Sequence, residues 1–211
     1  VGRPTAASLF LNDRRPEKVE PIWYRDGGDV VSETNAVLAT GGTDTVYSTL
    51  AAYTLTANVE NGRILATGAA NLTGNSLNNV LYAGVGNNAL DGSTGTDAVS
   101  YAYATAAVQV SLALTTVQAT GGSGSDTLLG IEDLTGSAYA DSLTGNNLAN
   151  VLDGGAGSDT MTGGNGSDIY YVRDVGDLVS ETNPTTGGND LVLSTLSSYT
   201  LGTNVENGCL L

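Results

Sequence analysis

The sequence predicts an all-β protein, a right-handed parallel β-roll (a β-solenoid) built from nonapeptide repeats with longer strands flanking them. Three observations support this fold: glycine-rich phrases recur every nine residues, one apolar residue keeps a fixed place in each phrase, and helix signals are almost absent. Each phrase reads as a six-residue turn of Gly, Asn and Asp followed by a three-residue strand. We expect strands this short to stack in a parallel coil rather than to form hairpins.

The most regular repeats are LTGSAYADS, LTGNNLANV, LDGGAGSDT and MTGGNGSDI, which begin at Leu134. An earlier and more degenerate set, LTGNSLNNV, LYAGVGNNA and LDGSTGTDA, begins at Leu72, and a single GGSGSD phrase spans 121–126. The apolar column of the two sets consists of Leu72, Leu81, Leu90, Leu134, Leu143, Leu152 and Met161. The polar residues that close the phrases are Asn79, Asn88, Asp97, Asp141, Asn150, Asp159 and Asp168.

A longer duplication lies over these repeats. YRDGGDVVSETN at 24–35 recurs as VRDVGDLVSETN at 172–183, and the segment at 41–62 recurs at 187–208. Because the second copy stops at Leu211, we expect the chain to be a fragment of a longer protein. The expected organisation is an atypical N-terminal segment (1–22), a first flank module (23–71), degenerate repeats (72–98), a strand insertion with one GGxGxD turn (99–133), regular nonapeptide repeats (134–169) and a truncated second flank module (170–211).

The charge of the chain excludes several classes of partner. The net charge is −15, and residues 26–211 hold 19 acidic residues but only two basic ones, Arg63 and Arg173. Nucleic acids and anionic membranes bind clustered Lys and Arg, so neither is expected as a partner. The longest apolar runs are too short for a membrane span. The single cysteine, Cys209, excludes an internal disulfide.

Enzyme signatures are also missing. With no histidine in the chain, neither an H-E-x-x-H zinc site nor a Ser-His-Asp triad can form. The glycine phrases lack the lysine of a phosphate-binding loop, and they end in an acid that would repel phosphate. We therefore expect no catalytic site in this chain.

The spacing of the closing residues points to a metal. If two nonapeptides form one coil, residues 18 apart stack, which places Asp141 over Asp159, Asn150 over Asp168, Asn79 over Asp97, and Asp159 over Asp177. Stacked carboxylates repel by about 1–4 kcal/mol, depending on the local dielectric. Calcium would reverse that sign, since it accepts 6–8 oxygen ligands, backbone carbonyls included. The alternative is a metal-free ladder of side chains, which the asparagines at 79, 88 and 150 favour.

The phrases GGAGSDTMT, GGNGSDIYY and GGSGSDTLL resemble the G-G-x-G-x-D-x-U-x repeat of the RTX (repeats-in-toxin, hemolysin-type calcium-binding) family. The resemblance extends over roughly residues 24–211. It implies that each calcium ion lies between stacked turns. The earlier turn would give the carbonyls of its second and fourth positions and its closing Asp, and the later turn the carbonyls of its first and third positions and its Asp.

Carried over to this sequence, the family pattern gives several ligand sets. One set is Ser137, Tyr139, Asp141, Gly154, Ala156 and Asp159. A second set is Asn146, Leu148, Asn150, Gly163, Asn165 and Asp168. A third set is Gly155, Gly157 and Asp159 with Asp174 and Asp177. A terminal set is Gly164, Gly166 and Asp168 with Asp177 or Glu181, so two sets compete for Asp177.

Other candidates are less firmly placed by the pattern. Gly122, Gly124 and Asp126 form a further half-site, with Asp133 as a candidate partner. Gly92, Thr94 and Asp97 form another. The acidic residues of the flank modules are expected to be solvated turn residues more often than ligands: Asp29, Glu33, Asp44, Glu181 and Asp190.

Two functions compete at this point. The resemblance implies an RTX β-roll that folds on binding Ca²⁺ outside the cell, as the folding and secretion module of a larger bacterial protein exported by the type I route. The alternative is a polysaccharide- or surface-binding repeat module in which calcium is only structural. Its binding face would use Tyr82, Tyr101, Tyr103, Tyr139, Tyr170 and Tyr171. At the last coil, an open strand edge after Leu211 would also invite pairing with another chain.

Overall fold

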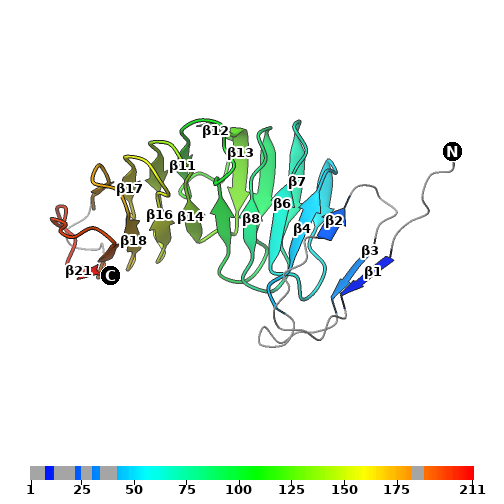
Figure 1. The fold of residues 1–211 in the computed structure, drawn as a ribbon, viewed down its shortest axis with the longest axis horizontal. Helices are drawn as coiled ribbons and strands as arrows, with labels where there is room; N and C mark the ends of the chain where they lie inside the picture. The colour runs from blue at the N-terminus through cyan, green and yellow to red at the C-terminus, as the bar shows by residue number, and fades with distance from the viewer. Residues whose placement is uncertain (1–7, 12–21, 25–29, 34–41, 182–187) are drawn as a thin grey trace.

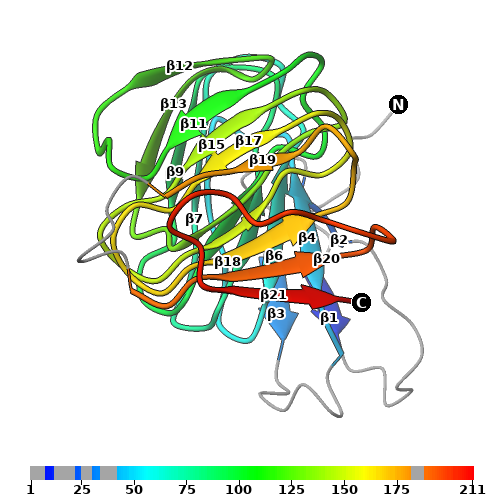
Figure 2. The ribbon, with the colours of Figure 1, turned by 90° about the vertical axis from the view of Figure 1, so that its left-hand side faces the viewer.

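The computed structural model of the 211-residue chain describes residues 8–11, 22–24, 30–33, 42–181 and 188–211. The described residues contain strands and turns but no helix. The chain winds in successive coils, and each coil places one strand on a long parallel sheet and another on the opposite face (Figures 1 and 2). The architecture is therefore an all-β parallel β-roll, as the repeats predict.

The long sheet has ten strands, and every neighbouring pair in it is parallel. In order across the sheet they are β2 (Ile22–Tyr24), β4 (Thr45–Ser48), β6 (Asn61–Ile64), β8 (Val80–Tyr82), β10 (Ala98–Ser100), β14 (Asp133–Thr135), β16 (Val151–Asp153), β18 (Ile169–Val172), β20 (Leu191–Ser194) and β21 (Asn207–Leu210).

The opposite face is made of two shorter sheets. The five-stranded sheet consists of β12 (Gln118–Gly121), β13 (Gly124–Leu129), β9 (Asn88–Asp91), β7 (Ala70–Thr73) and β5 (Ala52–Thr54). The four-stranded sheet consists of β11 (Gln109–Ser111), β15 (Ser142–Thr144), β17 (Thr160–Thr162) and β19 (Leu178–Val179). A separate parallel pair joins β1 (Ser8–Leu11) to β3 (Val30–Glu33).

The strand register shows how many repeats make one coil. Leu134 lies opposite Leu152 and Leu143 opposite Met161, so residues 18 apart are neighbours on adjacent strands. This confirms that two nonapeptides form one coil. The apolar column is the core of the roll, because all seven of its side chains are at most 1% exposed. An apolar residue every nine positions thus buries one side chain on each face of each coil, which is the main favourable term for folding.

The repeat breaks down in the insertion between β10 and β14. The two strands are neighbours in the long sheet, but the chain between them adds three strands, β11, β12 and β13, to the opposite face. β12 and β13 form an antiparallel hairpin whose turn is Gly122–Ser123. Gly121 and Gly124, which flank that turn, have φ of 73° and 85°, a region open to glycine. The expectation that such turns do not form hairpins is therefore wrong for this phrase.

No helix among the described residues is long and apolar enough to cross a membrane.

Candidate calcium sites

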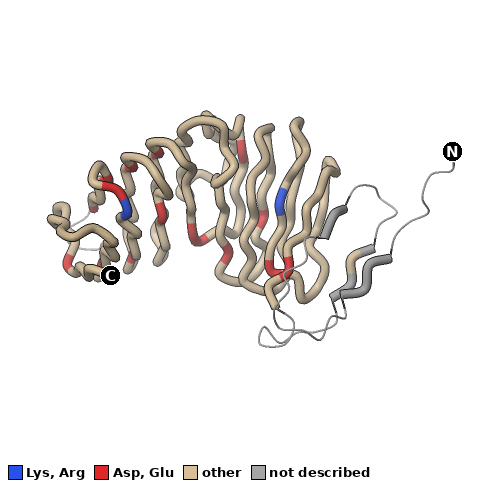
Figure 3. The backbone as a smooth tube through the Cα atoms, in the orientation of Figure 1, with Lys and Arg blue, Asp and Glu red and all other residues tan. Residues whose placement is uncertain are grey.

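The closing residues form two columns along the edges of the roll, and acidic residues, red in Figure 3, recur there from coil to coil. The long column consists of the residues that directly precede the strands of the ten-stranded sheet: Asp44, Glu60, Asn79, Asp97, Glu132, Asn150, Asp168, Asp190 and Glu206. The short column lies on the opposite face and consists of Asn88, Asp126, Asp141, Asp159 and Asp177.

A recurring hydrogen bond joins many successive members of each column. The backbone N–H of one closing residue donates to a carboxylate oxygen of the closing residue one coil later. Examples are Asn150 to Asp168 Oδ1 at 2.7 Å and Asp141 to Asp159 Oδ1 at 2.8 Å. The same bond joins Asn79 to Asp97 at 2.7 Å. These bonds confirm the stacking of residues 18 apart.

The second oxygen of several carboxylates has no partner. Among the described residues, no donor reaches the buried Oδ2 atoms of Asp97, Asp159, Asp168 and Asp190. These four side chains are at most 1% exposed. An unpaired buried carboxylate oxygen is costly, and buried charges in proteins are normally paired or bound to a metal. The four atoms are therefore the strongest candidates for cation ligands.

The carboxylates one coil before and one coil after Asp159 do not share its unpaired oxygen. Both Asp141 and Asp177, one coil on either side, have N–H donors on both oxygens. Ser137 N–H binds Asp141 Oδ2, and the N–H groups of Arg173 and Asp174 each bind Asp177 Oδ2 at 2.9 Å. Among these three carboxylates, only that of Asp159 has an oxygen, Oδ2, without a donor from the described residues, so Asp159 is the candidate cation ligand of the three.

Asparagine replaces the cation at other levels. The Nδ2 group of Asn79 donates to the carbonyls of Val59 and Glu60 at 3.0 and 3.1 Å, and that of Asn150 donates to the Glu132 carbonyl at 2.7 Å. In both residues Oδ1 accepts an N–H from the same turn. Each amide supplies the positive end of a dipole where a carboxylate would need an ion. These contacts favour the metal-free ladder at the asparagine levels, which stays a prediction.

The first glycine of each turn keeps space free beside the closing carboxylate. A Cβ on Gly154 would overlap Asp159 Oδ2, and a Cβ on Gly163 would overlap both Asp168 Oδ2 and the Tyr170 hydroxyl. On Gly136, a Cβ would overlap the Gly154 carbonyl oxygen and Asp141 Oδ2. Carbonyl and carboxylate oxygens thus converge around glycine Cα atoms, which is a donor set suited to calcium.

We predict that Gly154→Ala destabilises the folded protein in calcium by about 1–3 kcal/mol, because the added methyl group must displace Asp159 Oδ2. Gly68→Ala is the matched control, since a Cβ there meets nothing within 4 Å, and its effect should stay within about 0.5 kcal/mol. Thermal unfolding of both variants in calcium tests this. Equal midpoints for the two variants would contradict the steric explanation.

The structure brings together most members of the first three predicted ligand sets. The Ser137 carbonyl accepts the Ala156 N–H at 3.3 Å, and the Tyr139 carbonyl lies against Gly157. One half-coil later, the Asn146 carbonyl accepts the Asn165 N–H at 3.2 Å, with Leu148 against Gly166. In the third set, Asp174 Oδ2 accepts the Gly157 N–H at 3.1 Å. The assignment of these groups as ion ligands stays a prediction.

The competition for Asp177 has a clear geometric answer. Asp177 Oδ1 accepts the Asp159 N–H at 3.1 Å, so Asp177 belongs to the short column. The terminal turn instead receives Glu181, whose carboxylate accepts the N–H groups of Gly163 and Gly164 at 3.0 and 3.2 Å. Asp168 N–H donates to Asp190 Oδ1 at 2.9 Å, 22 residues further on.

The acidic residues of the flank modules differ from their expected solvated state. Asp44, Glu181 and Asp190 are buried, with 6%, 4% and 0% exposure. From the sequence these residues are either ligands or solvated turn residues, and the solvated alternative is wrong for them. The 18-residue period does not reveal this part of the long column, because steps of 22 and 16 residues place Asp190 and Glu206 in it. Asp29 and the side chain of Glu33 lie outside the described part of the chain.

The GGSGSD phrase stacks on a different partner from the expected one. Asp126 Oδ1 accepts the Asn88 N–H at 2.8 Å, while Asp133 Oδ1 accepts the Val151 N–H. The second oxygen of Asp126 accepts the Thr120 hydroxyl at 3.1 Å. Gly122 and Gly124 lie in the hairpin, so this phrase offers no unpaired carboxylate oxygen. Near Gly92, by contrast, the Gly130 carbonyl and Asp97 Oδ2 converge; Thr94 lies exposed in the same turn.

Burial raises the pKa of several carboxylates in and beside the two columns. In the metal-free protein, the pKa values of Asp126, Asp159 and Asp168 rise to about 6, and that of Glu181 rises to about 7. The pKa values of Asp97 and Asp190 rise for the same reason. Neighbouring carboxylates add to the effect at Asp159. Raised carboxylate pKa values are what a cation site shows when the cation is absent.

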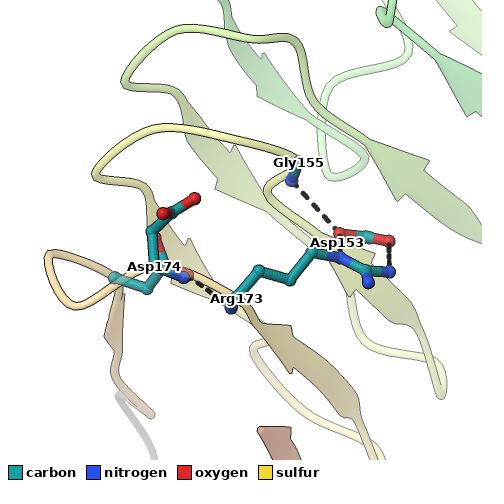
Figure 4. Close-up of polar contacts among 5 residues, drawn as sticks. Asp153, Gly155, Arg173 and Asp174 are labelled. Atoms are coloured by element: carbon teal, nitrogen blue, oxygen red, sulfur yellow. Dashed lines mark hydrogen bonds and ion pairs between the residues drawn. The ribbon is translucent and has the colours of Figure 1, made fainter. Parts of the chain in front are cut away.

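One ion pair joins the repeats to the second flank module. The Arg173 guanidinium donates to both oxygens of Asp153, at 3.0 and 2.6 Å, and Gly155 N–H donates to Asp153 Oδ1 at 3.1 Å (Figure 4). Because the Arg173 side chain is 44% exposed, this pair adds little stability, at most about 1 kcal/mol. Its role is to fix the orientation of the chain after β18.

The tyrosines considered for a sugar-binding face do not form one surface. Tyr101 and Tyr170 are fully buried. Tyr82 and Tyr103 lie together, with ring centroids 5.7 Å apart, but the Arg63 guanidinium carbon lies 3.2 Å from the Tyr103 centroid and covers that ring. Tyr139 is in a turn, and Tyr171 lies on β18 under Arg173.

A comparison with models of protein families identifies the repeats. The model of the RTX calcium-binding nonapeptide repeat matches residues 67–100 and 135–170, in four copies. No curated protein matches the chain significantly. The matched segments include three of the four unpaired carboxylates, those of Asp97, Asp159 and Asp168. Residues 67–100 and 135–170 of this chain are therefore repeats of the RTX calcium-binding family, arranged in a β-roll.

Proposed function

We propose that this chain is a calcium-dependent structural module, in which ions bound between successive turns hold the β-roll together. The unpaired Oδ2 atoms of Asp97, Asp159, Asp168 and Asp190 are the observation that carries this proposal. Each is buried in an environment that holds the other oxygen of the same carboxylate by a backbone N–H. A cation is the partner that such an oxygen requires.

Within this proposal, the ions bind at particular levels. One position is beside Asp159, where Asp141 contributes from the preceding coil and the Gly154 carbonyl contributes from the turn that Asp159 closes. Another is beside Asp168, opposite Asn150. A third is beside Asp97, where the Gly130 carbonyl lies where a regular repeat would place the carbonyl of its own glycine. The levels closed by Asn79 and Asn88 bind no ion, because their amides already donate to the carbonyls there.

The setting of this function follows from the same electrostatics. With 19 acidic residues and two arginines in residues 26–211, the unfolded chain repels itself where calcium is scarce, as in a cytosol. Where calcium is abundant, ion binding and folding become one coupled event. We propose that the module folds outside the cell, as part of a larger exported bacterial protein that leaves by the type I route.

Equilibrium dialysis of the 211-residue chain against calcium tests the proposed ion positions. We expect Asp159→Asn to bind one ion fewer than the wild type, because the asparagine amide takes the place of the cation. Asn150→Asp should bind one ion more, because it replaces the donor to the Glu132 carbonyl by a carboxylate oxygen. A wild-type chain that binds no calcium would refute the function, and unchanged stoichiometry in both variants would refute the positions.

A further inference from the structure

Three buried carboxylates meet where the last repeat joins the second flank module. One carboxylate oxygen from each of Asp168, Glu181 and Asp190 lies within 4.8 Å of the other two. Asp168 closes the last nonapeptide, Glu181 follows β19, and Asp190 precedes β20. Unlike the turn sites, this cluster consists of side chains, and two of its three members lie outside the repeats.

The hydrogen bonds around the cluster leave one oxygen each of Asp168 and Asp190 without a partner in the described part of the chain. Backbone N–H groups hold one oxygen each of Asp168 and Asp190, and both oxygens of Glu181. The remaining Oδ2 atoms of Asp168 and Asp190 have no donor among the described residues, and both residues are fully buried. The buried Tyr170 hydroxyl, which lies beside Asp168 Oδ2 over Gly163, also lacks a partner.

Nothing cationic in the described part of the chain neutralises this cluster. Its only two cationic side chains are Arg63 and Arg173, and Arg173 is paired with Asp153. Three ionised carboxylates within this distance, without a counter-charge, would be strongly destabilising.

The size of the cluster indicates which cation fits. Two oxygens on opposite sides of a calcium ion lie about 4.8 Å apart, since each Ca–O distance is about 2.4 Å. Magnesium requires about 2.1 Å and an octahedral set, and it retains several waters. One oxygen from each of the three carboxylates lies within 4.8 Å of the other two, so a calcium ion between them can bind all three.

We propose that Asp168, Glu181 and Asp190 bind one further divalent cation of calcium's size, and that this ion fastens the flank strands β19, β20 and β21 to the last repeat. This inference rests on the proposed calcium-binding function. The ion links three segments of chain that are successive along the roll. Its loss therefore affects the attachment of the flank module more than the stability of the repeats at 134–162.

Asp190→Asn is the most informative variant. Its Oδ1 still accepts the Asp168 N–H, while its amide can donate to Asp168 Oδ2, as the closing asparagines donate at their own levels. We expect the variant to bind one calcium ion fewer than the wild type. In chelator at acidic pH, where the metal-free fold is favoured, it should be more stable than the wild type. Asp153→Asn, which removes the half-buried carboxylate charge that pairs with Arg173 on the outer face of the same sheet, is the control and should keep the wild-type stoichiometry.

Two measurements separate this inference from the wider function. The first is the number of ions bound in dialysis, and the second is hydrogen exchange of residues 191–210 with and without calcium. We expect Asp190→Asn to lose calcium-dependent protection in that segment while residues 142–162 keep theirs. Glu181→Gln repeats the test with a different ligand. Equal stoichiometry and equal protection in the wild type and both variants would overturn the inference; a wild type without bound calcium would overturn the wider function as well.

Discussion

At pH 7.5 in a chelator, the chain should lose most of its β-sheet structure, and millimolar calcium should restore it. The two columns stack carboxylates on adjacent strands, about 5 Å apart, where each unscreened pair costs about 1–4 kcal/mol. A whole domain is stable by only about 5–15 kcal/mol, so a few such pairs decide whether it folds. Calcium at 100 times its dissociation constant contributes about 2.7 kcal/mol per site.

Far-UV circular dichroism measures this change directly. The spectrum should move from that of an unfolded chain to that of a β-sheet as calcium is added, and magnesium at the same concentration should have a much smaller effect. Asp153→Asn should respond to calcium as the wild type does, because Asp153 lies on the outer face with Arg173. A β-sheet spectrum in chelator that calcium does not change would refute the calcium-dependent fold.

Acidification should partly replace calcium. Burial raises the pKa of Asp159 and Asp168 to about 6 and that of Glu181 to about 7 in the metal-free fold, above the ordinary values of 3.8 and 4.5. The folded state then binds more protons than the unfolded state between pH 4 and pH 7. Its stability is therefore highest near pH 4 and falls as the pH rises through these pKa values. After allowance for solvent screening at the turns, each group contributes about 1 kcal/mol.

A pH titration with and without calcium tests whether the stability of the metal-free fold increases on acidification. In chelator, β-sheet content should increase as the pH falls from 7.5 to 5. In calcium, the ion affinity should fall over the same range, because protons compete for the same oxygens. Asp168→Asn should flatten both dependences. A metal-free chain that loses structure steadily on acidification would contradict the prediction.

The sequence was sufficient to predict the regular repeats, but not the insertion or the junction with the second flank module. The apolar residues from Leu134 to Met161 and the closing residues from Asp141 to Asp168 repeat strictly, so their period alone determines the coil and the stacking. The hairpin at Gly122–Ser123 and the step to Asp190 depend on how far the chain travels before it rejoins the sheet. Tertiary packing determines how many residues the chain uses before it rejoins the sheet, and a periodic sequence pattern does not predict that number.

For the glycines and the asparagines, the sequence predicted only part of the role that the structure shows. The glycine positions indicated tight turns, and the structure shows that several also keep the space beside a carboxylate open. The asparagines at 79, 88 and 150 suggested a neutral ladder without saying to what their amides would bind. Only the coordinates show that these amides point to carbonyls of the preceding coil.

The asparagine levels also give the folding of this chain a direction. In a solenoid, each coil is stabilised mainly by its immediate neighbours, so assembly spreads from whichever coils form first. The coils around Asn79 and Asn88 satisfy their own carbonyls without an ion and can form first as a template. Under the proposed function, the aspartate-closed coils toward the C-terminus need calcium before they can add to that template. We therefore expect folding to start at the asparagine levels and to spread toward the C-terminus once calcium is bound.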